Sequence, residues 1–243
     1  KGRDPILQYR VAFISLGCAK NQVNCEQMMA AVTAAGHTVQ TDPAGADVVV
    51  VNTCCFIGDA KEESINTLLE MEKLKEEGVI KVLIASGCLA QRYKEEIQKE
   101  IPGVDAIIGT MAIDKITESV DKALAGRSEN YFKDISATPV YGKKRIVTTG
   151  GHYAYMKIAE GCDKHCTYCI IPKVRGGYRS IPMESLLKEA AELAENGVRE
   201  LILVAQETTL YGKDLYGKKS LPLLLHKLAA VSYTHLTLPT NSR

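Results

Sequence analysis

The chain has 243 residues, enough for one large domain or two ordinary ones, and its 46% hydrophobic and 24% charged residues are typical of a globular protein with a buried core. No stretch approaches the roughly 20 uninterrupted apolar residues of a membrane-spanning helix, and no apolar run follows the N-terminal residues, so we expect neither a membrane anchor nor a signal peptide. The formal net charge of +1 gives no strong signal for nucleic-acid binding. We therefore expect a cytoplasmic protein.

In the first half of the chain, short apolar segments alternate with longer amphipathic ones. Apolar runs bounded by turn residues predict strands, and apolar residues spaced three or four apart predict helices. The predicted strands cover residues 11–16, 47–51, 80–85 and 106–108, and the predicted helices cover residues 21–35, 60–77, 91–100 and 113–125. Because this alternation is typical of a parallel sheet covered by helices, we expect residues 6–126 to form a doubly wound α/β domain.

The second half begins with a Gly-, Pro-, Lys- and Thr-rich connection over residues 127–150. A second series of strands and helices is predicted over residues 151–230. It comprises strands at 153–158 and 201–205, a loop at 161–177, and helices at 183–195 and 221–230. Residues 231–243 are Thr- and Ser-rich and fit neither period, so we expect a non-native or disordered tail outside the fold.

Three of the eight cysteines, Cys162, Cys166 and Cys169, are spaced CxxxCxxC on the predicted loop. With no export signal we expect reduced thiols, and three close thiolates can hold three irons of a 4Fe-4S cluster. The fourth iron then has no protein ligand in the motif and is open to a small chelating molecule. The alternative is a zinc site with His165 as the fourth ligand, but no second ligand pair lies nearby.

A second set of cysteines is spread along the first domain. Cys18, Cys54 and Cys88 each follow one of the first three strands predicted there. Residues just past the carboxyl ends of neighbouring parallel strands share one edge of the sheet, so these three thiols can converge and also leave one iron open. The alternative is that they are buried packing residues. We interpret Cys25 and Cys55 as bystanders.

The CxxxCxxC loop, with Tyr168 before its last cysteine, resembles the cluster motif of radical S-adenosylmethionine (SAM) enzymes. The resemblance implies that the open iron binds SAM, and that one electron from the cluster splits SAM into methionine and a 5′-deoxyadenosyl radical. It also implies that Tyr168 lies beside the SAM adenine. Simple packing is the alternative role for Tyr168.

Both cysteine sets, in this order, resemble the methylthiotransferase family over about residues 6–230. The N-terminal matches are Cys18-Ala19-Lys20-Asn21, Asn52-Thr53-Cys54 with Phe56-Ile57, and Gly87-Cys88-Leu89-Ala90-Gln91-Arg92-Tyr93. The resemblance implies an auxiliary 4Fe-4S cluster in the first domain, followed by the first βα units of a partial, TIM-like radical SAM barrel. Two departures are Asn24-Cys25, where the family has Asp-Ser, and Cys55, where it has Gly.

The family has one branch that modifies a tRNA adenosine and another that modifies an aspartate of a ribosomal protein. The segments 170–180, 205–209 and 211–217 look like the ribosomal branch. Gln206, at the end of a predicted strand, is expected to contact cofactor or substrate, with strand-end capping as the alternative. Arg175 and Arg179 are candidates for meeting an acidic substrate, with solvated loop arginines as the alternative.

The resemblance thus implies an enzyme that attaches a methylthio group to the β-carbon of an aspartate in a small-subunit ribosomal protein, using SAM and two 4Fe-4S clusters. Cys162, Cys166 and Cys169 would hold the cluster that binds SAM, and Cys18, Cys54 and Cys88 the auxiliary one. An electron donor and a sulfur donor are needed. Since only two βα units of the barrel are predicted, we expect a fragment that is inactive alone. The rival functions are tRNA methylthiotransferase and non-enzymatic iron–sulfur carrier.

Overall fold

The computed structural model describes residues 8–231 and 235–237, and the chain divides into two compact units, Lys1–Asp134 and Ile135–Arg243. Each unit is built around a parallel sheet, which confirms the predicted α/β class. Among the described residues, no helix combines the length and the apolar character that crossing a membrane requires.

The first unit has a five-stranded sheet in the order β2-β1-β3-β4-β5, with every pair parallel. Its strands are β1 (Arg10–Ser15), β2 (Thr38–Gln40), β3 (Val48–Thr53), β4 (Val82–Ser86) and β5 (Ala106–Ile108). In this doubly wound order the connections reverse direction between β1 and β3, and ligands bind outside the carboxyl ends of the strands at that point. The short edge strand β2 was not predicted, because it has one apolar residue among three, whereas the equally short β5 is a run of three buried apolar residues.

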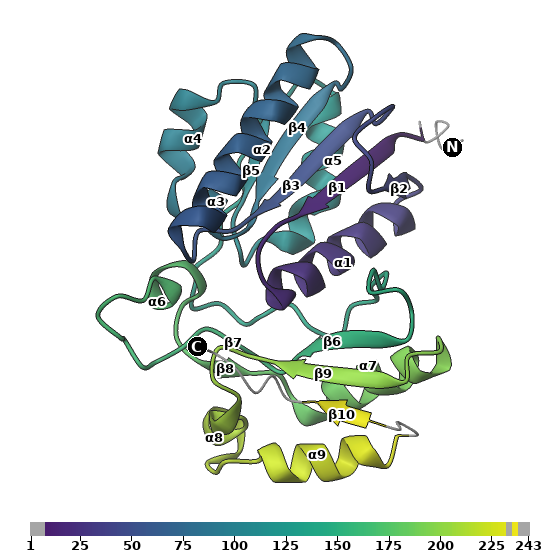
Figure 1. Ribbon diagram of the computed structural model, residues 1–243, viewed down its shortest axis with the longest axis vertical. Coiled ribbons are helices and arrows are strands. Elements are labelled where there is room, and N and C mark those ends of the chain that lie inside the picture. The colour runs from purple at the N-terminus through teal and green to yellow at the C-terminus, as the bar shows by residue number, and fades with distance from the viewer. Residues whose placement is uncertain (1–7, 232–234, 238–243) are drawn as a thin grey trace, which may run out of the picture. The chain divides into compact units, whose positions relative to one another are not determined.

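Helices cover both faces of this sheet. They are α1 (Ala19–Ala34), α2 (Gly58–Glu76), α3 (Gly87–Arg92), α4 (Lys94–Glu100) and α5 (Ile116–Leu124), with the 3₁₀ turn η1 (Ile113–Lys115) before α5. Helix α2 contacts β3 and β4, whereas α5 contacts α1, β4 and β5, and Figure 1 shows α2 in front of the sheet and α5 behind it. All six residues of β3 are buried, as a central parallel strand covered on both faces requires.

The second unit has a three-stranded parallel sheet in the order β10-β9-β6 and a two-stranded antiparallel ribbon of β7 and β8. Its strands are β6 (Tyr153–Lys157), β7 (Ala159–Glu160), β8 (Arg179–Ser180), β9 (Glu200–Val204) and β10 (His235–Thr237). Its helices are α6 (Ile171–Arg175), α7 (Met183–Glu195), α8 (Lys213–Tyr216) and α9 (Leu221–Ala229), with the 3₁₀ turn η2 (Thr208–Leu210). The order β6-α7-β9-α9-β10 (Figure 1) is a run of parallel βαβ units, the connectivity that βα barrels repeat.

Three boundaries differ from the sequence prediction. The predicted tail includes β10, which pairs with β9 because an edge strand of a parallel sheet offers unpaired backbone groups; residues 232–234 and 238–243 of that tail lie outside the described residues. The helix predicted at 91–100 is two helices, and the first begins at Gly87, so Cys88 lies in a helical turn. The predicted loop 161–177 contains α6.

One buried phenol lies in the core of the second unit. Tyr211 is 0% exposed, and its hydroxyl donates a hydrogen bond of 2.8 Å to the carbonyl of Ile181. We expect Tyr211→Phe to lower the free energy of unfolding by about 1–3 kcal/mol, because it leaves a buried carbonyl without its donor. Calorimetric unfolding measures this, with Tyr168→Phe, at an 89% exposed ring, as the control. Equal unfolding midpoints for the two variants would contradict the prediction.

Candidate metal centres

The three N-terminal cysteines lie at the carboxyl edge of β1, β3 and β4. Cys18 is the N-cap residue of α1 directly after β1, Cys54 follows β3, and Cys88 lies in the first turn of α3 after β4. The register pairs Asn52 with Ser86 and continues in a bridge between Thr53 and Gly87. Cys54 and Cys88 are therefore the residues that follow the last paired positions of two neighbouring strands.

Gly17 brings the Cys18 loop against Cys54. Its backbone has φ of +87°, and a Cβ atom at this position would lie 2.5 Å from Cys54 Cβ and 2.7 Å from Cys54 Sγ. Only glycine allows this approach, because any side chain would clash and would also make the left-handed conformation costly. The loop after β1 and the loop after β3 are thus in direct contact beside the Cys54 thiol.

Buried hydroxyl groups fix the backbone on either side of Cys54. The Ser64 hydroxyl, 0% exposed on α2, accepts a hydrogen bond from Cys54 N (2.9 Å) and can donate to Cys54 O (3.0 Å). Thr53 Oγ1 donates to Ser86 O (2.5 Å) and accepts from Ala90 N (3.2 Å), which ties β3 to the turn that carries Cys88. Ser64 was not predicted as a site residue, because a serine within an amphipathic helix is a common residue without a motif.

Cys25 and Cys55 are buried thiols in the same unit. Burial raises the pKa of Cys25 to about 12. Burial, followed by the nearby Cys88 and Cys54, raises the pKa of Cys55 to about 12 against the opposing effect of Arg92. Both therefore remain neutral thiols near pH 7, so neither is a reactive thiolate.

The second cysteine set lies on the loop between β7 and α6. Cys162 and Cys169 are partly exposed and Cys166 is exposed. Backbone contacts close the base of this loop: Cys162 N donates to Gly176 O (3.1 Å), and Tyr178 N donates to Asp163 Oδ1 (2.8 Å). Within the loop, Cys169 N donates to Cys166 O (2.9 Å).

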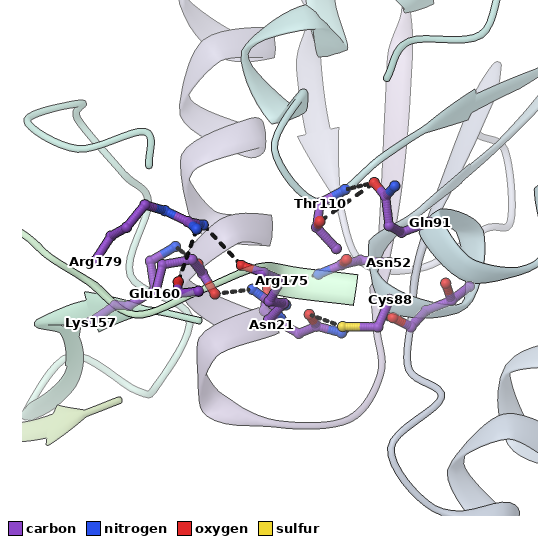
Figure 2. A network of polar contacts seen from close by, with 11 residues as sticks. Asn21, Asn52, Cys88, Gln91, Thr110, Lys157, Glu160, Arg175 and Arg179 are labelled. Atoms are coloured by element: carbon purple, nitrogen blue, oxygen red, sulfur yellow. Dashed lines mark hydrogen bonds and ion pairs between the residues drawn. The ribbon is translucent and has the colours of Figure 1, made fainter. Parts of the chain in front are cut away.

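A buried triad of charged side chains also stabilises the base of the cysteine loop. Glu160, on β7, accepts from Arg175 Nη1 of α6 (2.8 Å) and from Lys157 Nζ of β6 (3.0 Å), and the three residues are 1%, 1% and 4% exposed. Figure 2 shows these side chains converging on the Glu160 carboxylate. Burial alone would raise the pKa of Glu160, but the charges of Arg175 and Lys157 outweigh it and hold that pKa far below its ordinary value.

The triad corrects the expectation for Arg175, and two backbone contacts show what Arg179 holds. Arg175 is neither solvated nor open to a substrate, because its guanidinium is buried against Glu160. Arg179 is partly buried and donates to the carbonyls of Gly177 (2.9 Å) and Arg175 (2.8 Å). Both arginines hold the base of the cysteine loop, a role that a loop arginine in a sequence does not reveal.

The two other predicted site residues lie apart from the core. Tyr168 is 89% exposed, so the structure does not use its ring for packing. Gln206 is partly exposed and lies two residues past β9. Its neighbour Glu207 forms an ion pair with Lys164 of the cysteine loop, and hydrogen bonding from Lys164 lowers the pKa of that carboxylate. The carboxyl end of β9 therefore lies against the cysteine loop.

Each cysteine set offers three soft sulfur ligands, the chemistry that iron–sulfur clusters use. Among residues 8–231 and 235–237, no three His, Cys, Asp or Glu side chains are arranged as a ready-made site for a single metal ion. His165 is exposed, with a left-handed backbone at φ of +46°.

Each unit matches a known protein family. Residues 10–109 match Uncharacterized protein family UPF0004, and residues 156–242 match the Radical SAM superfamily. Among solved structures, the fold is similar to the cobalamin-dependent S-adenosylmethionine radical enzyme OxsB (TM-score 0.58, 10% identity, 93% of this chain and 37% of that chain). It is also similar to the radical S-adenosylmethionine methyltransferase TsrM from Kitasatospora setae (TM-score 0.57, 12% identity, 97% of this chain and 59% of that chain). The match to the Radical SAM superfamily includes the CxxxCxxC loop, and the likeness to the two solved structures is one of fold.

Curated relatives define the family more closely. The chain is 59% identical over 222 residues to "Ribosomal protein uS12 methylthiotransferase RimO" of Lachnoclostridium phytofermentans, and 47% identical over 218 residues to the protein of that name from Clostridium tetani. These matches cover 91% and 90% of this chain but 50% and 49% of the relatives, so the chain spans about half the length of the curated relatives it matches. Over about nine tenths of its length the chain is therefore similar to methylthiotransferases, with a match to the Radical SAM superfamily in its second unit.

The contact between Gly17 and Cys54 can be tested against a matched glycine. We expect Gly17→Ala to destabilise the first unit and to reduce iron binding there, because the new methyl group displaces the Cys54 thiol. Gly78→Ala is the control, since Gly78 has φ of +75° but a Cβ atom there would meet nothing within 4 Å. The left-handed backbone costs about 1–2 kcal/mol in both variants, so only the difference reports the contact. Equal thermal midpoints and equal iron content would contradict the prediction.

The Glu160 triad predicts both a stability loss and a pH dependence. Glu160→Gln should cost about 3–5 kcal/mol, because it leaves two buried cations without their carboxylate. A carboxylate with a lowered pKa stabilises the fold above its unfolded pKa, and this contribution is lost as the pH falls below about 4.3. The wild type should therefore lose stability in acid more steeply than the variant.

Thermal unfolding between pH 3 and pH 7 measures both effects. Glu118→Gln is the control, because Glu118 forms ion pairs with Lys115 and Lys122 on the exposed surface, where salt bridges contribute little. A Glu160→Gln midpoint at pH 7 no lower than that of Glu118→Gln would contradict the prediction.

Proposed function

We propose that the protein adds a methylthio group to the β-carbon of an aspartate in ribosomal protein uS12. The observation that supports this most directly is the 59% identity over 91% of this chain to a relative that carries that name. The segments 170–180 and 205–209 also resemble the ribosomal branch of the family. We further propose that the protein acts in the cytoplasm, with an electron donor and a sulfur donor as partners.

We propose two 4Fe-4S clusters and SAM as the cofactors. Cys162, Cys166 and Cys169 would hold one cluster, and the other would be held by Cys18, Cys54 and Cys88. The donor sets fit, because each has three thiols at one loop cluster and leaves one iron without a protein ligand. When SAM is bound to the first cluster, that site supplies a carbon radical, which is needed because an unactivated C–H bond resists acid–base chemistry.

The residues around the second cysteine set have distinct tasks in this proposal. The exposed ring of Tyr168 is available to stack on the SAM adenine, and Gln206 is available to contact cofactor or substrate from the end of β9. The triad of Glu160, Arg175 and Lys157 holds the base of the loop in one conformation, and this fixes where the loop that carries the three thiols begins and ends. The Lys164–Glu207 ion pair fastens the loop to the strand that carries Gln206.

Cluster loading is the first test, because it needs only this chain, whereas the curated relatives are about twice as long. Iron and acid-labile sulfide are measured after anaerobic reconstitution of the wild type and of Cys162→Ala, Cys54→Ala and Cys25→Ala. We expect about eight irons per chain, about half that number in the first two variants, and no change in the Cys25→Ala control.

The other outcomes decide between the rival functions. Zinc in place of iron would contradict the radical SAM function. An EPR spectrum of the reduced protein that SAM does not change would favour an iron–sulfur carrier. Binding of tRNA with a steep salt dependence, and none of uS12, would favour the tRNA branch.

A further inference from the structure

Asn21 is a fully buried polar side chain at the centre of the N-terminal cysteine loops. It lies in the first turn of α1, three residues after Cys18, and is 0% exposed. Burying an amide costs free energy unless its donors and its acceptor form hydrogen bonds. The hydrogen-bond partners of Asn21 therefore indicate its role.

The amide nitrogen of Asn21 binds the two neighbouring loops. Nδ2 donates to the carbonyl of Leu16 (3.1 Å), at the end of β1, and to the carbonyl of Thr53 (2.9 Å), the residue before Cys54. Carbonyl oxygens only accept, so two of them match the two hydrogens of an amide nitrogen and fix which way the amide faces.

The amide oxygen of Asn21 therefore faces the third loop. Cys88 Sγ lies 3.8 Å from Asn21 Oδ1 as a hydrogen-bond donor (Figure 2). The main chain of Asn21 is held as well, because Asn52 Nδ2 donates to Asn21 O (2.7 Å) from the buried end of β3. One side chain thus contacts all three loops that carry Cys18, Cys54 and Cys88.

We infer that Asn21 is a positioning residue that holds the three cysteine loops together before a cluster binds, an inference that rests on the proposed function. Without the amide, the parallel sheet still brings the loops to one edge, but the Asn21 contacts to the Leu16 carbonyl, the Thr53 carbonyl and Cys88 Sγ are lost. A Cys88 thiolate that binds iron has no hydrogen to donate, so in the loaded site Asn21 acts through its bonds to the Leu16 and Thr53 carbonyls. Mutation of such outer-shell residues costs roughly 10–100-fold in metal affinity.

The test uses the whole chain with Cys162, Cys166 and Cys169 all replaced by Ala, so that iron reports on the N-terminal site alone. Asn21→Asp and Asn21→Ser are made in this background. The first keeps the shape of the side chain but loses the amide donors, and the second lacks the reach to the carbonyls. After reconstitution we expect both variants to release iron to a ferrous chelator roughly 10-fold faster than the background chain.

Gln27→Met is the matched control, because Gln27 is buried on the same helix and, among the described residues, its side-chain oxygen has no hydrogen-bond partner. It should release iron at the background rate. Circular dichroism of the apo-proteins shows whether each variant is folded.

Three outcomes are decisive. Folded Asn21 variants with the background rate of iron release would overturn the inference, and so would loss of the folded unit in both variants, since Asn21 would then serve the fold as a whole. A background chain that binds no iron would instead overturn the proposed auxiliary cluster.

Discussion

The parallel register of β1, β3 and β4 is the constraint on which the N-terminal site depends. Cys18, Cys54 and Cys88 are 36 and 34 residues apart in sequence, and only strands that run in the same direction bring their carboxyl ends to one edge. The register continues to the Thr53–Gly87 bridge, so backbone pairing holds together the two residues that come just before Cys54 and Cys88. The close approach of Gly17 to Cys54 then brings the third loop to the same point.

The three cysteines of each set are brought to one region of the fold in different ways. The CxxxCxxC set is local, so chain connectivity already keeps the three thiols together, and the fold needs only to close the base of the loop. Closure comes from the β7–β8 ribbon and from the Glu160 triad, whose buried charges stabilise one another only in that arrangement. The N-terminal set has no local connection, and buried hydroxyl and amide groups on several elements hold it instead.

Much of the architecture was predictable, because apolar runs and helical periodicity report burial directly. The four main strands of the first unit and the two βα units of the second were predicted, and the α/β class is confirmed. Strands β2, β7, β8 and β10 were missed, since none of these short strands contains an apolar run and each is defined by its pairing partner. The start of α3 was placed four residues late, because Gly87 and Cys88 look like loop residues when the preceding strand is not known to end at Ser86.

By itself, the sequence determined the order of strands and helices, the identity of the six cysteines in two sets, and the resemblance to methylthiotransferases. These features follow from the residue composition and from short spacings between residues along the chain. Only the tertiary structure decided what the polar residues around the cysteines do: that Arg175 is buried against Glu160, that Ser64 holds Cys54, and that Asn21 contacts three loops. The physical reason is that a hydrogen bond or a buried ion pair depends on partners brought together by folding, and these partners lie up to 67 residues apart.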